Sequence, residues 1–384
     1  MCFLFITFIF KINIHFFWTL NYYMLNIIYK LTSFFTKVSL VIFLILYSLS
    51  LLSKYDISII SPLIAPFGLI FPTLYLFSIL AFLILFIGKK FGYAFVYFIA
   101  LVIGINTFTA YIQWNPQEQK GIKIMSWNIK NFDLYNWTKN KETEQKIYDF
   151  IKNENPDIIC FQEFYSDQES FSHLRKLKKY GYRFQKMKTT FQMKDKKWGL
   201  AIVSKFPIQK YHTLDALNRF KNNNGMSCEI KTPEGIVEIL NIHFKSINLD
   251  YEDYALLEGK TNQMNAKYHQ AKLIFKKIWS SYPQRAEQTD IVLNYIKQSN
   301  SKNILLCCDM NDIPCSYSYH KITKNYIDGF KSSGRGIAKT YDFIVPFRID
   351  YIFHSDNVSF NSYEMKATKL SDHYPLIGHF KLRQ

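Results

Sequence analysis

Six short motifs that carry acids, amides or histidines occur in order along the last two thirds of the chain. They are Ser126-Trp127-Asn128, Phe161-Gln162-Glu163, Asn241-Ile242-His243, Asp309-Met310-Asn311, Arg348-Ile349-Asp350-Tyr351 and Ser371-Asp372-His373. Each follows or ends a short apolar run, so each places a polar side chain at the end of a predicted strand. Strand ends on a packed sheet bring distant parts of a chain together. Carboxylates and carboxamides suit Mg²⁺, and with two histidines the set indicates metal-assisted phosphate hydrolysis.

The elements that must position these motifs alternate between strands and helices. The spacing predicts a strand over residues 122–127, a helix over 141–155 that ends before Pro156, and a strand over 157–161. Such a β-α-β unit usually gives neighbouring parallel strands. Further strands are expected at residues 199–204, 228–230, 237–242, 303–308, 351–354 and 376–381, and helices at 267–279 and 285–298. This mixture favours a two-sheet α/β sandwich, and the chain has no GxGxxG or P-loop pattern.

The charge is strongly basic and unevenly placed. The 384 residues carry a formal net charge of +17. Residues 1–114 hold six lysines, no arginine and one acid, Asp56, whereas the rest holds 41 basic and 29 acidic side chains, a balance of +12. A basic domain favours anionic partners such as nucleic acid, phosphorylated lipid or an anionic membrane, although general solubility explains the charge equally well. Nothing in the sequence indicates a protein partner.

The six cysteines do not form a metal-binding or disulfide pattern. None of them shows CxxC spacing. Cys160, Cys307 and Cys308 lie inside apolar runs, and the neighbours Cys307 and Cys308 would point to opposite faces of a strand. We therefore expect buried thiols.

The first 114 residues contain three long apolar stretches. They run from about Leu31 to Leu52, from 67 to 87, and from about Phe91 to Tyr111. The second alone would span a hydrocarbon core of roughly 30 Å. Three such stretches favour a membrane anchor of about three helices over a buried soluble helix, and a cleaved signal peptide would not explain the later two. We expect residues 1–114 to form this anchor and residues 115–384 a separate domain.

The lysines predict the orientation of the anchor. Lys89 and Lys90 lie between the second and third stretches, and Lys30 and Lys37 lie near the start of the first. Positive residues tend to stay in the cytoplasm, which would place the domain after Gln113 outside it. A crossing by residues 3–29 would reverse this result, and Met24 is an alternative start of the protein.

The ordered motifs resemble the endonuclease/exonuclease/phosphatase superfamily, which has the DNase-like fold. The resemblance extends from about Gly121 to Arg383 and includes Gly199-Leu200-Ala201-Ile202-Val203-Ser204 and Asp309-Met310-Asn311-Asp312-Ile313-Pro314. The apolar stretches make the chain similar to membrane-attached bacterial members. The resemblance implies an αββα sandwich and a Mg²⁺-dependent phosphoesterase, with Mn²⁺ as an alternative ion, in which water attacks phosphorus in line. The family usually has glycine before the motif aspartate, where this chain has Cys308.

The resemblance also implies roles for single residues. Asn128, Glu163 and Asp372 would hold the metal, whereas His243, Asp309, Asn311, Asp350 and His373 would be catalytic. Asp309 would orient or deprotonate water, Asn311 would contact the phosphate, and His243 would donate to it. Asp350 and His373 would form a carboxylate–imidazole pair, and either His373 or Asp309 would be the general base. Arg285 is a candidate for phosphate binding, as is Arg348, although a salt bridge is the simpler explanation for both.

Three kinds of function remain to be compared. The leading hypothesis is a membrane-anchored phosphodiesterase or endonuclease. The alternatives are a lipid phosphodiesterase and a non-catalytic, membrane-tethered binding module of the same fold. A transporter is not favoured, because the apolar stretches have no charge pair or broken-helix pattern.

Overall fold

The structure is a computed structural model that describes residues 2–55, 61–167, 173–220, 224–249, 251–257, 264–343 and 347–383. The chain divides into two compact units, Met1–Leu49 and Ser50–Gln384. The first unit is helical and belongs to α1 (Cys2–Leu52). The second unit contains the remaining helices, all the strands and all six polar motifs. The predicted division between residues 114 and 115 stays a prediction, although Ile112–Trp114 already forms a strand, β1.

Three helical segments are long and apolar enough to cross a membrane. They are Met24–Leu52 in α1, Ala65–Ile87, and Phe91–Phe108. The second segment consists of η2 (Ala65–Ile70) and α3 (Phe71–Ile87), which follow α2 (Ser61–Ile64), and the third is α4. α3 and α4 pack side by side, with the rings of Tyr75 and Phe108 stacked at 4.1 Å between centroids. The three apolar segments expected from the sequence are therefore present.

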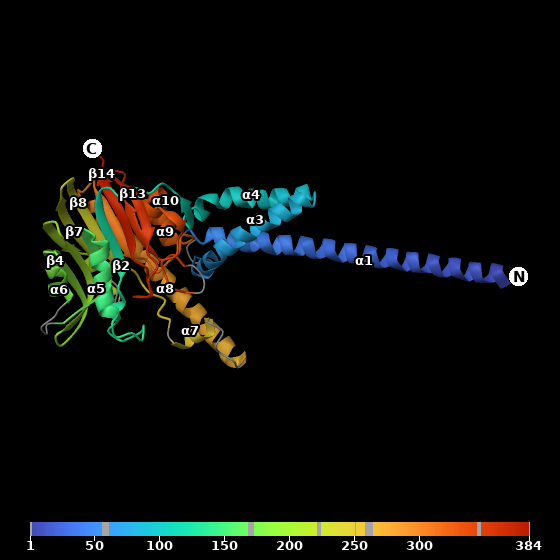
Figure 1. Ribbon diagram of the computed structural model, residues 1–384, viewed down its shortest axis with the longest axis horizontal. Coiled ribbons are helices and arrows are strands. Elements are labelled where there is room, and N and C mark those ends of the chain that lie inside the picture. The colour runs from blue at the N-terminus through green and yellow to red at the C-terminus, as the bar shows by residue number, and fades with distance from the viewer. Residues whose placement is uncertain are drawn as a thin grey trace. The chain divides into compact units, whose positions relative to one another are not determined.

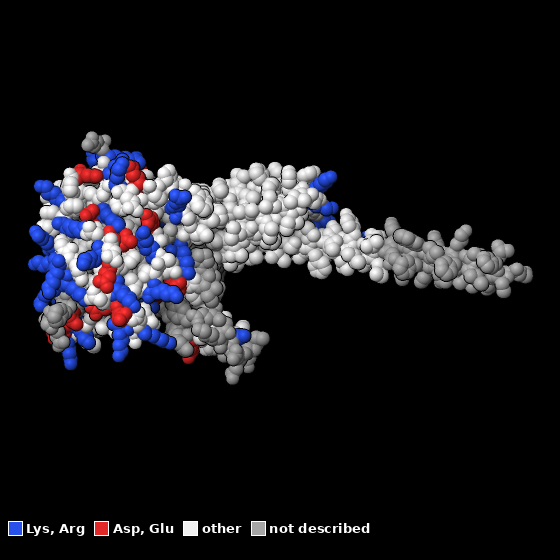
Figure 2. Space-filling model, viewed as in Figure 1, with Lys and Arg blue, Asp and Glu red and all other residues white. Residues whose placement is uncertain are grey.

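The charge differs sharply between the two parts of the second unit. Figure 2 shows lysines, arginines and acids mixed over the surface of the β-rich part and an uncharged surface along α3 and α4. The blue atoms at the far tip of these helices belong to the turn between them, where Lys89 and Lys90 lie. An uncharged surface of this length suits the hydrocarbon region of a bilayer.

Two mixed six-stranded sheets form the β-rich part (Figure 1). The first has the order β13-β14-β2-β3-β5-β4, with bounds Val358–Met365, Leu376–Leu382, Ile122–Asn128, Ile158–Ser166, Lys196–Ser204 and Phe184–Met193. The second has the order β10-β12-β9-β8-β7-β6, with bounds Ile327–Asp328, Asp350–His354, Ile304–Asp309, Gly235–His243, Asn224–Thr232 and Ile208–Thr213. A small sheet pairs β1 with β11 (Arg335–Ile337).

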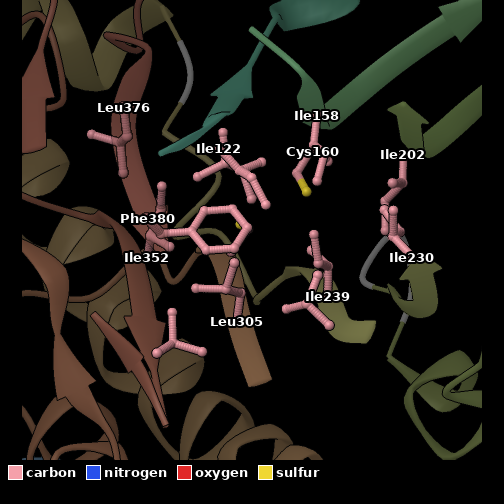
Figure 3. Packing of buried hydrophobic residues seen from close by; sticks show 14 of the residues in the cluster. Ile122, Ile158, Cys160, Ile202, Ile230, Ile239, Leu305, Ile352, Leu376 and Phe380 are labelled. Carbon is pink, nitrogen blue, oxygen red and sulfur yellow. The ribbon is translucent and has the colours of Figure 1, made fainter. Parts of the chain in front are cut away.

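The two large sheets pack face to face through alternate side chains of their strands. Figure 3 shows residues of the first sheet, such as Ile122 and Phe380, pointing toward residues of the second, such as Ile239 and Leu305. The other side chains of the same strands point outward, which is the period of two expected for strands. Cys307 lies in this central core and its neighbour Cys308 in the outer one, as the sequence indicated. The five cysteines from Cys160 to Cys315 are free and buried.

Helices cover the outer face of each sheet. α5 (Thr143–Glu154) and α6 (His173–Lys179) pack on the first sheet together with η3 (Lys130–Asp133). α8 (Met264–Gln298) and α9 (Tyr317–Ile322) pack on the second, beside η4 (Asp215–Arg219). Two further short helices are α7 (Tyr251–Leu257) and α10 (Gly329–Ser333). The predicted αββα sandwich is therefore confirmed.

One local prediction was wrong, because α8 is a single helix where two were expected. Pro283 lies inside it and removes one backbone hydrogen bond. The helix continues through this point because the residues on both sides are anchored by burial: Ser281, Tyr282 and Arg285 are each less than 5% exposed. Tertiary packing here outweighs the local preference of proline to end a helix.

The apolar helical segments are joined to the sandwich by specific contacts. Ser53 Oγ donates to the carbonyl of Cys315 at 2.8 Å, and Cys315 Sγ lies 3.1 Å from the carbonyl of Ser50. A Cβ atom on Gly68 would lie 2.3 Å from the Cys315 carbonyl oxygen, so only glycine permits this approach of η2. After α4, Arg348 donates to the carbonyl of Ala110 at 2.8 Å. Both ends of the α3–α4 hairpin are thus held against the sandwich.

His173 is an imidazole buried on the outer face of the first sheet. Its ring stacks on Phe132 at 3.8 Å between centroids, and its Nδ1 lies 2.5 Å from the hydroxyl of Tyr148. Burial lowers the pKa of His173 to about 4, with Asp167 raising it and Lys176 lowering it to smaller extents. The folded protein therefore holds this ring neutral where an unfolded chain would protonate it.

This burial predicts a loss of stability on mild acidification. Because the folded pKa is about 4 and the unfolded value about 6.5, the unfolded state binds the extra proton between these pH values. The free energy of unfolding should fall as the pH falls through this window. In the full-length protein, we expect the melting temperature of the wild type to drop further between pH 7 and pH 5 than that of His173→Phe. The exposed His212 provides the control, because His212→Phe should show the same drop in melting temperature as the wild type. An equal drop in all three proteins would show that burial of His173 does not cause the effect.

Candidate active site

The polar motifs meet at one edge of the sandwich because of how the strands pair. β2 and β3 run parallel, as do β8 and β9, so the carboxyl ends of each pair lie at the same edge. His243 and Asp309 are register partners at the ends of β8 and β9. Asp350, the first residue of β12, is the antiparallel partner of Asp309. Three of the predicted site residues therefore stand side by side across one sheet, and the other sheet brings Asn128 to the same place.

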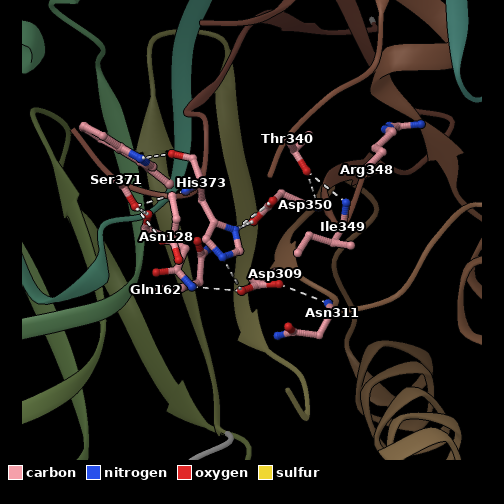
Figure 4. Close-up of polar contacts among 12 residues, drawn as sticks. Asn128, Gln162, Asp309, Asn311, Thr340, Arg348, Ile349, Asp350, Ser371 and His373 are labelled. Atoms are coloured by element: carbon pink, nitrogen blue, oxygen red, sulfur yellow. Dashed lines mark hydrogen bonds and ion pairs between the residues drawn. The ribbon is translucent and has the colours of Figure 1, made fainter. Parts of the chain in front are cut away.

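The Asp309 carboxylate lies at the centre of this group and is 1% exposed. Its Oδ2 accepts a hydrogen bond from Nδ2 of Asn128 at 2.9 Å and lies 3.5 Å from His243 Nε2 and 3.9 Å from His373 Nε2. Its Oδ1 accepts from the backbone N–H of Asn311 at 3.0 Å. Figure 4 shows the contacts of Asn128, Asn311 and His373 converging on Asp309.

The cysteine that replaces the family's glycine does not disturb this arrangement. Cys308 is paired in β9 with Ile242 on one side and Tyr351 on the other, so its backbone is extended. Extended backbone suits any residue, and Asp309 is positioned by a regular ladder. The left-handed conformation occurs instead at Asn311, where φ is 50°. Asparagine tolerates this conformation better than most residues.

Glu163 is brought to the cleft by an irregularity in β3. The pairing of β3 with β5 shifts register between Phe161 and Phe164, and Glu163 has φ of 46°. Such a bulge redirects a side chain that regular alternation would send elsewhere. Its Oε1 accepts a hydrogen bond from Asn128 Nδ2 at 3.1 Å and lies 3.8 Å from His243 Nε2. Asn128 thus holds the carboxylates of Glu163 and Asp309 toward each other, while its Oδ1 accepts from the backbone N–H of Lys130.

Asp350 and His373 form a close carboxylate–imidazole pair. The two oxygens of Asp350 lie 3.1 and 3.0 Å from His373 Nδ1, and both residues are about 5% exposed. Trp127 Nε1 donates to the carbonyl of His373 at 2.9 Å, and the ring of Tyr341 meets the imidazole edge-on at 4.9 Å. With Nδ1 occupied by Asp350, only Nε2 of His373 faces the cleft.

The carboxylates around His373 control its charge. Burial by itself lowers the pKa of the imidazolium, but Asp350 and Asp309 outweigh it and raise that pKa above the usual range for histidine. Burial raises the pKa of Asp350, although His373 opposes this rise. The pair is therefore an imidazolium beside a carboxylate at neutral pH, and its Nε2–H can donate into the cleft.

The remaining predicted residues lie at the rim of the same cleft. Asp372 forms an ion pair with Lys130 at 2.6 Å. Burial raises the pKa of Asp372, but the nearby His373 and Lys130 outweigh this effect and lower it. Asn311 donates through Nδ2 to the carbonyl of Phe244 at 3.2 Å and lines the cavity. Asp372 therefore lines the same cavity as Glu163 and Asp309, but it is held by Lys130 and not by Asn128.

The two candidate arginines have different positions. Arg348 is fully buried away from the cleft and donates to both oxygens of Asp328, at 2.7 and 2.6 Å. Arg285 lines the cavity, but its Nε donates to Asp312 at 3.1 Å and its Nη1 to Ser281 at 2.8 Å. Arg348 is therefore a structural residue, and Arg285 positions Asp312 next to the cleft.

Two cavities open on this cleft and share Glu163. One, of about 390 Å³, is lined by Asp309, Asp372 and His373 together with apolar residues. The other, of about 500 Å³, is lined by His243, Lys245 and exposed rings of Tyr135 and Phe191. A phosphate at the cleft would therefore have space for a different substituent on each side.

Three residues of the site were not identified from the sequence. Lys130 pairs with Asp372, Thr340 Oγ1 accepts the backbone N–H of Asp350 at 3.1 Å, and Tyr341 packs on His373. Lys130 lies two positions after Asn128, and that proximity to a motif was the one signal for it. Thr340 and Tyr341 lie between motifs and carried no signal.

The donor groups in the cleft fit a hard divalent cation. Glu163 and Asp309 offer carboxylate oxygens held together by one amide, and Glu163 is partly exposed to both cavities. His243 Nε2 is buried with no hydrogen-bond partner among the described residues, although it faces both carboxylates. A second group, Asp309, Asp350 and His373, has ligand atoms within 4.8 Å of one another. Since Asp350 occupies Nδ1 of that histidine, we favour the Glu163 side for the cation.

Comparison with solved structures gives the same fold at low sequence identity. An endonuclease/exonuclease/phosphatase from Bacteroides vulgatus is 17% identical, with a TM-score of 0.51 over 68% of this chain and 99% of that one. The human Nocturnin catalytic domain with bound sulfate is 18% identical, with a TM-score of 0.50 over 69% and 96% of the two chains. A functionally unknown conserved protein from Enterococcus faecalis V583 is 15% identical, with a TM-score of 0.50 over 68% and 100%.

No curated protein matches the sequence. A family model does match, over residues 125–373, and this range begins in β2 and ends at the histidine of the last motif. It contains every residue that we placed in the cleft. The chain therefore belongs to the Endonuclease/Exonuclease/phosphatase family.

Proposed function

We propose that the protein is a membrane-anchored, divalent-metal-dependent phosphodiesterase. The observation that supports this most is the meeting of Glu163, Asp309 and His373 in one cleft, although they come from three distant motifs. An acidic pair beside an imidazolium matches the needs of phosphate ester hydrolysis, in which negative charge develops on the phosphate oxygens. The family supports a phosphoesterase, and the choice of substrate and metal is part of this proposal.

Each side chain near the phosphate has its own proposed role in the hydrolysis. Asp309 accepts a hydrogen bond from the attacking water and orients it toward phosphorus, or takes its proton. His373 donates from Nε2 to a phosphate oxygen, since Asp350 keeps its other nitrogen occupied. His243 Nε2 faces the same phosphate, and Asn311 would donate to it through the N–H of Nδ2 that does not bond Phe244. A Mg²⁺ or Mn²⁺ ion would be held by Glu163, which Asn128 holds toward Asp309, with Asp372 as a further acid at the same cavity, and it would neutralise charge on the phosphate.

A non-catalytic binding module is the alternative function. The Asp350–His373 pair argues against it, because the carboxylate is bonded to one imidazole nitrogen and leaves the other at a cavity, which structural support alone does not require. Apolar residues at these positions would stabilise a mere scaffold at least as well. Every site position that we matched to the family's motifs also carries an acid, an amide or a histidine.

Asp350 should act only through His373, which a double-mutant cycle can test. We expect His373→Ala to lower the turnover of bis-p-nitrophenyl phosphate by roughly 10²–10⁴-fold, and Asp350→Asn to lower it substantially. The double variant should be no slower than His373→Ala, because Asp350 has no other partner at the phosphate. His212→Ala, on an exposed strand position, is the matched control. Independent, multiplicative losses would contradict the assigned pairing.

Glu163 should determine the affinity for the metal. Glu163→Gln keeps the shape but removes the charge, so we expect the Mg²⁺ concentration for half-maximal turnover to rise by about tenfold or more. EDTA should abolish wild-type turnover, and Mg²⁺ or Mn²⁺ should restore it. Glu229→Gln removes a surface acid that pairs with Lys210 and should leave the Mg²⁺ titration unchanged. An unchanged titration for Glu163→Gln would place the cation elsewhere.

We also propose that the chain crosses the membrane three times and that the catalytic part lies outside the cytoplasm. Lys89 and Lys90 in the α3–α4 turn support this orientation, since basic turns stay in the cytoplasm. A bacterial alkaline phosphatase fused after Gln384 should then be active, because that reporter folds only outside the cytoplasm, and one fused after Lys90 should be inactive. The opposite pattern would reverse the orientation.

A further inference from the structure

The cavity that contains Asp309 and His373 has a second, apolar wall. This wall consists of Ala65, Leu69, Ile247, Ile274, Ile278 and Ile313. Its residues come from η2, from the loop after β8, from α8 and from the loop after β9. The phosphate chemistry proposed above needs none of these side chains. A phosphate ester that used them would therefore carry a sizeable apolar group.

Two of the wall residues belong to a segment that can cross a membrane. Ala65 and Leu69 lie at the start of the apolar segment Ala65–Ile87. The cavity that holds the catalytic residues is therefore bounded by the point where the chain enters the membrane. An apolar chain could pass from the bilayer into this cavity without crossing water, which removes the main cost of extracting a lipid.

This wall is fixed in relation to the catalytic loop. Gly68 allows η2 to touch the carbonyl of Cys315, and Ser53 donates to the same carbonyl at 2.8 Å. Cys315 lies six residues after Asp309, and Asp312 and Ile313 between them line the cavity. The membrane-entry segment thus completes the cavity as a structural part of it.

The helix that contributes Ile274 and Ile278 to this wall has an outer face suited to a membrane surface. Ile274 and Ile278 of α8 line the cavity, whereas Tyr268, Phe275 and Trp279 are exposed. With Lys272, the exposed rings recur every three or four residues and so share one face of the helix. Aromatic rings and lysines together are typical of helices that lie at the boundary of a bilayer. α8 also packs against α2 and η2.

We propose that the substrate is a membrane lipid that carries a phosphodiester. This inference rests on the proposed phosphodiesterase function and names its substrate class. The lipid's phosphate lies at Asp309 and His373, and its apolar chain lies between η2 and α8. The polar substituent occupies the second cavity, where Asn131, Asn224 and Lys245 offer polar groups. Water attacks phosphorus, the P–O bond to one substituent breaks, and that substituent leaves as an alcohol after taking up a proton.

The test uses the full-length protein in detergent with a series of p-nitrophenyl phosphodiesters. The second ester group is methyl, butyl or octyl, and a thymidine ester represents nucleic acid. Because all share one leaving group, kcat/KM compares the apolar group alone. We expect kcat/KM to rise with chain length, by on the order of tenfold or more from methyl to octyl. Release of a water-soluble product from phospholipid vesicles, either the head-group alcohol or its phosphomonoester, should accompany this rise.

Variants show whether the wall causes this preference. Leu69→Glu and Ile278→Glu place a charge in the apolar wall and should reduce the octyl-to-methyl ratio at least tenfold relative to wild type. Ile278→Ala removes most of the same contact without adding a charge, and it should lower the ratio in the same direction if the glutamate variant does not fold. Ile236→Glu makes the same change at an exposed position outside the cavity and should keep the wild-type ratio.

The outcomes separate the two proposals. If no diester releases p-nitrophenol with Mg²⁺ or Mn²⁺, the proposed phosphodiesterase function fails and the lipid inference with it. If the methyl ester is hydrolysed but chain length has no effect, the function stands and the lipid inference is overturned. A preference for the thymidine ester that Leu69→Glu and Ile278→Glu leave unchanged would overturn it in favour of nucleic acid.

Discussion

A buried carboxylate, Asp309, is the constraint on which the site depends. A carboxylate that is 1% exposed is costly to ionise unless its oxygens have partners. The partners come from both sheets: Asn128 from the first, Asn311 from the next loop, and the imidazoles of His243 and His373 at longer range. The parallel pairing of β2 with β3 and of β8 with β9 is what allows this, because it brings strand ends from separate halves of the chain to one edge. The same pairing brings the acids that we propose as cation ligands into one cleft.

Much of this arrangement could be predicted from the sequence, because the motifs end apolar runs whose period and order are local properties. The two-sheet α/β sandwich, the three apolar segments and the opposite orientations of Cys307 and Cys308 are examples. The bulge that turns Glu163 toward Asn128 could not be predicted, since it depends on how β3 meets β5. The contact of Tyr341 with His373 depends in the same way on tertiary packing. The two arginines were ambiguous for a similar reason. Their partners, Asp312 and Asp328, lie at distances along the chain that no periodicity connects.

The helical segments beside the sandwich contribute more than attachment. A flexible tether would leave the cleft free to turn in any direction relative to the bilayer. Here the chain before α2 bonds to the loop after Asp309, and the chain after α4 bonds to Arg348, which is itself locked to Asp328. The Asp328–Arg348 pair is completely buried, so its loss would leave a charge without a partner inside the protein. These contacts fix the cleft relative to η2 and α3, and so relative to any membrane that α3 enters.

This fixed geometry distinguishes between nucleic acid and lipid as substrates, which the basic charge could not do. Lysines spread over the surface of the β-rich part would attract any anion, whether nucleic acid or lipid, and so carry little information about substrate (Figure 2). The wall of the cavity is more selective, because an apolar surface rejects a charged nucleotide and accepts an acyl chain. Glu163 lies where the apolar cavity meets the second cavity, which has a mixed polar and aromatic lining, so the scissile phosphate would be held between an apolar and a more polar half of the substrate. In the proposed function, the chemistry comes from the strand ends, and the selection of substrate comes from residues at the start of the apolar segment Ala65–Ile87.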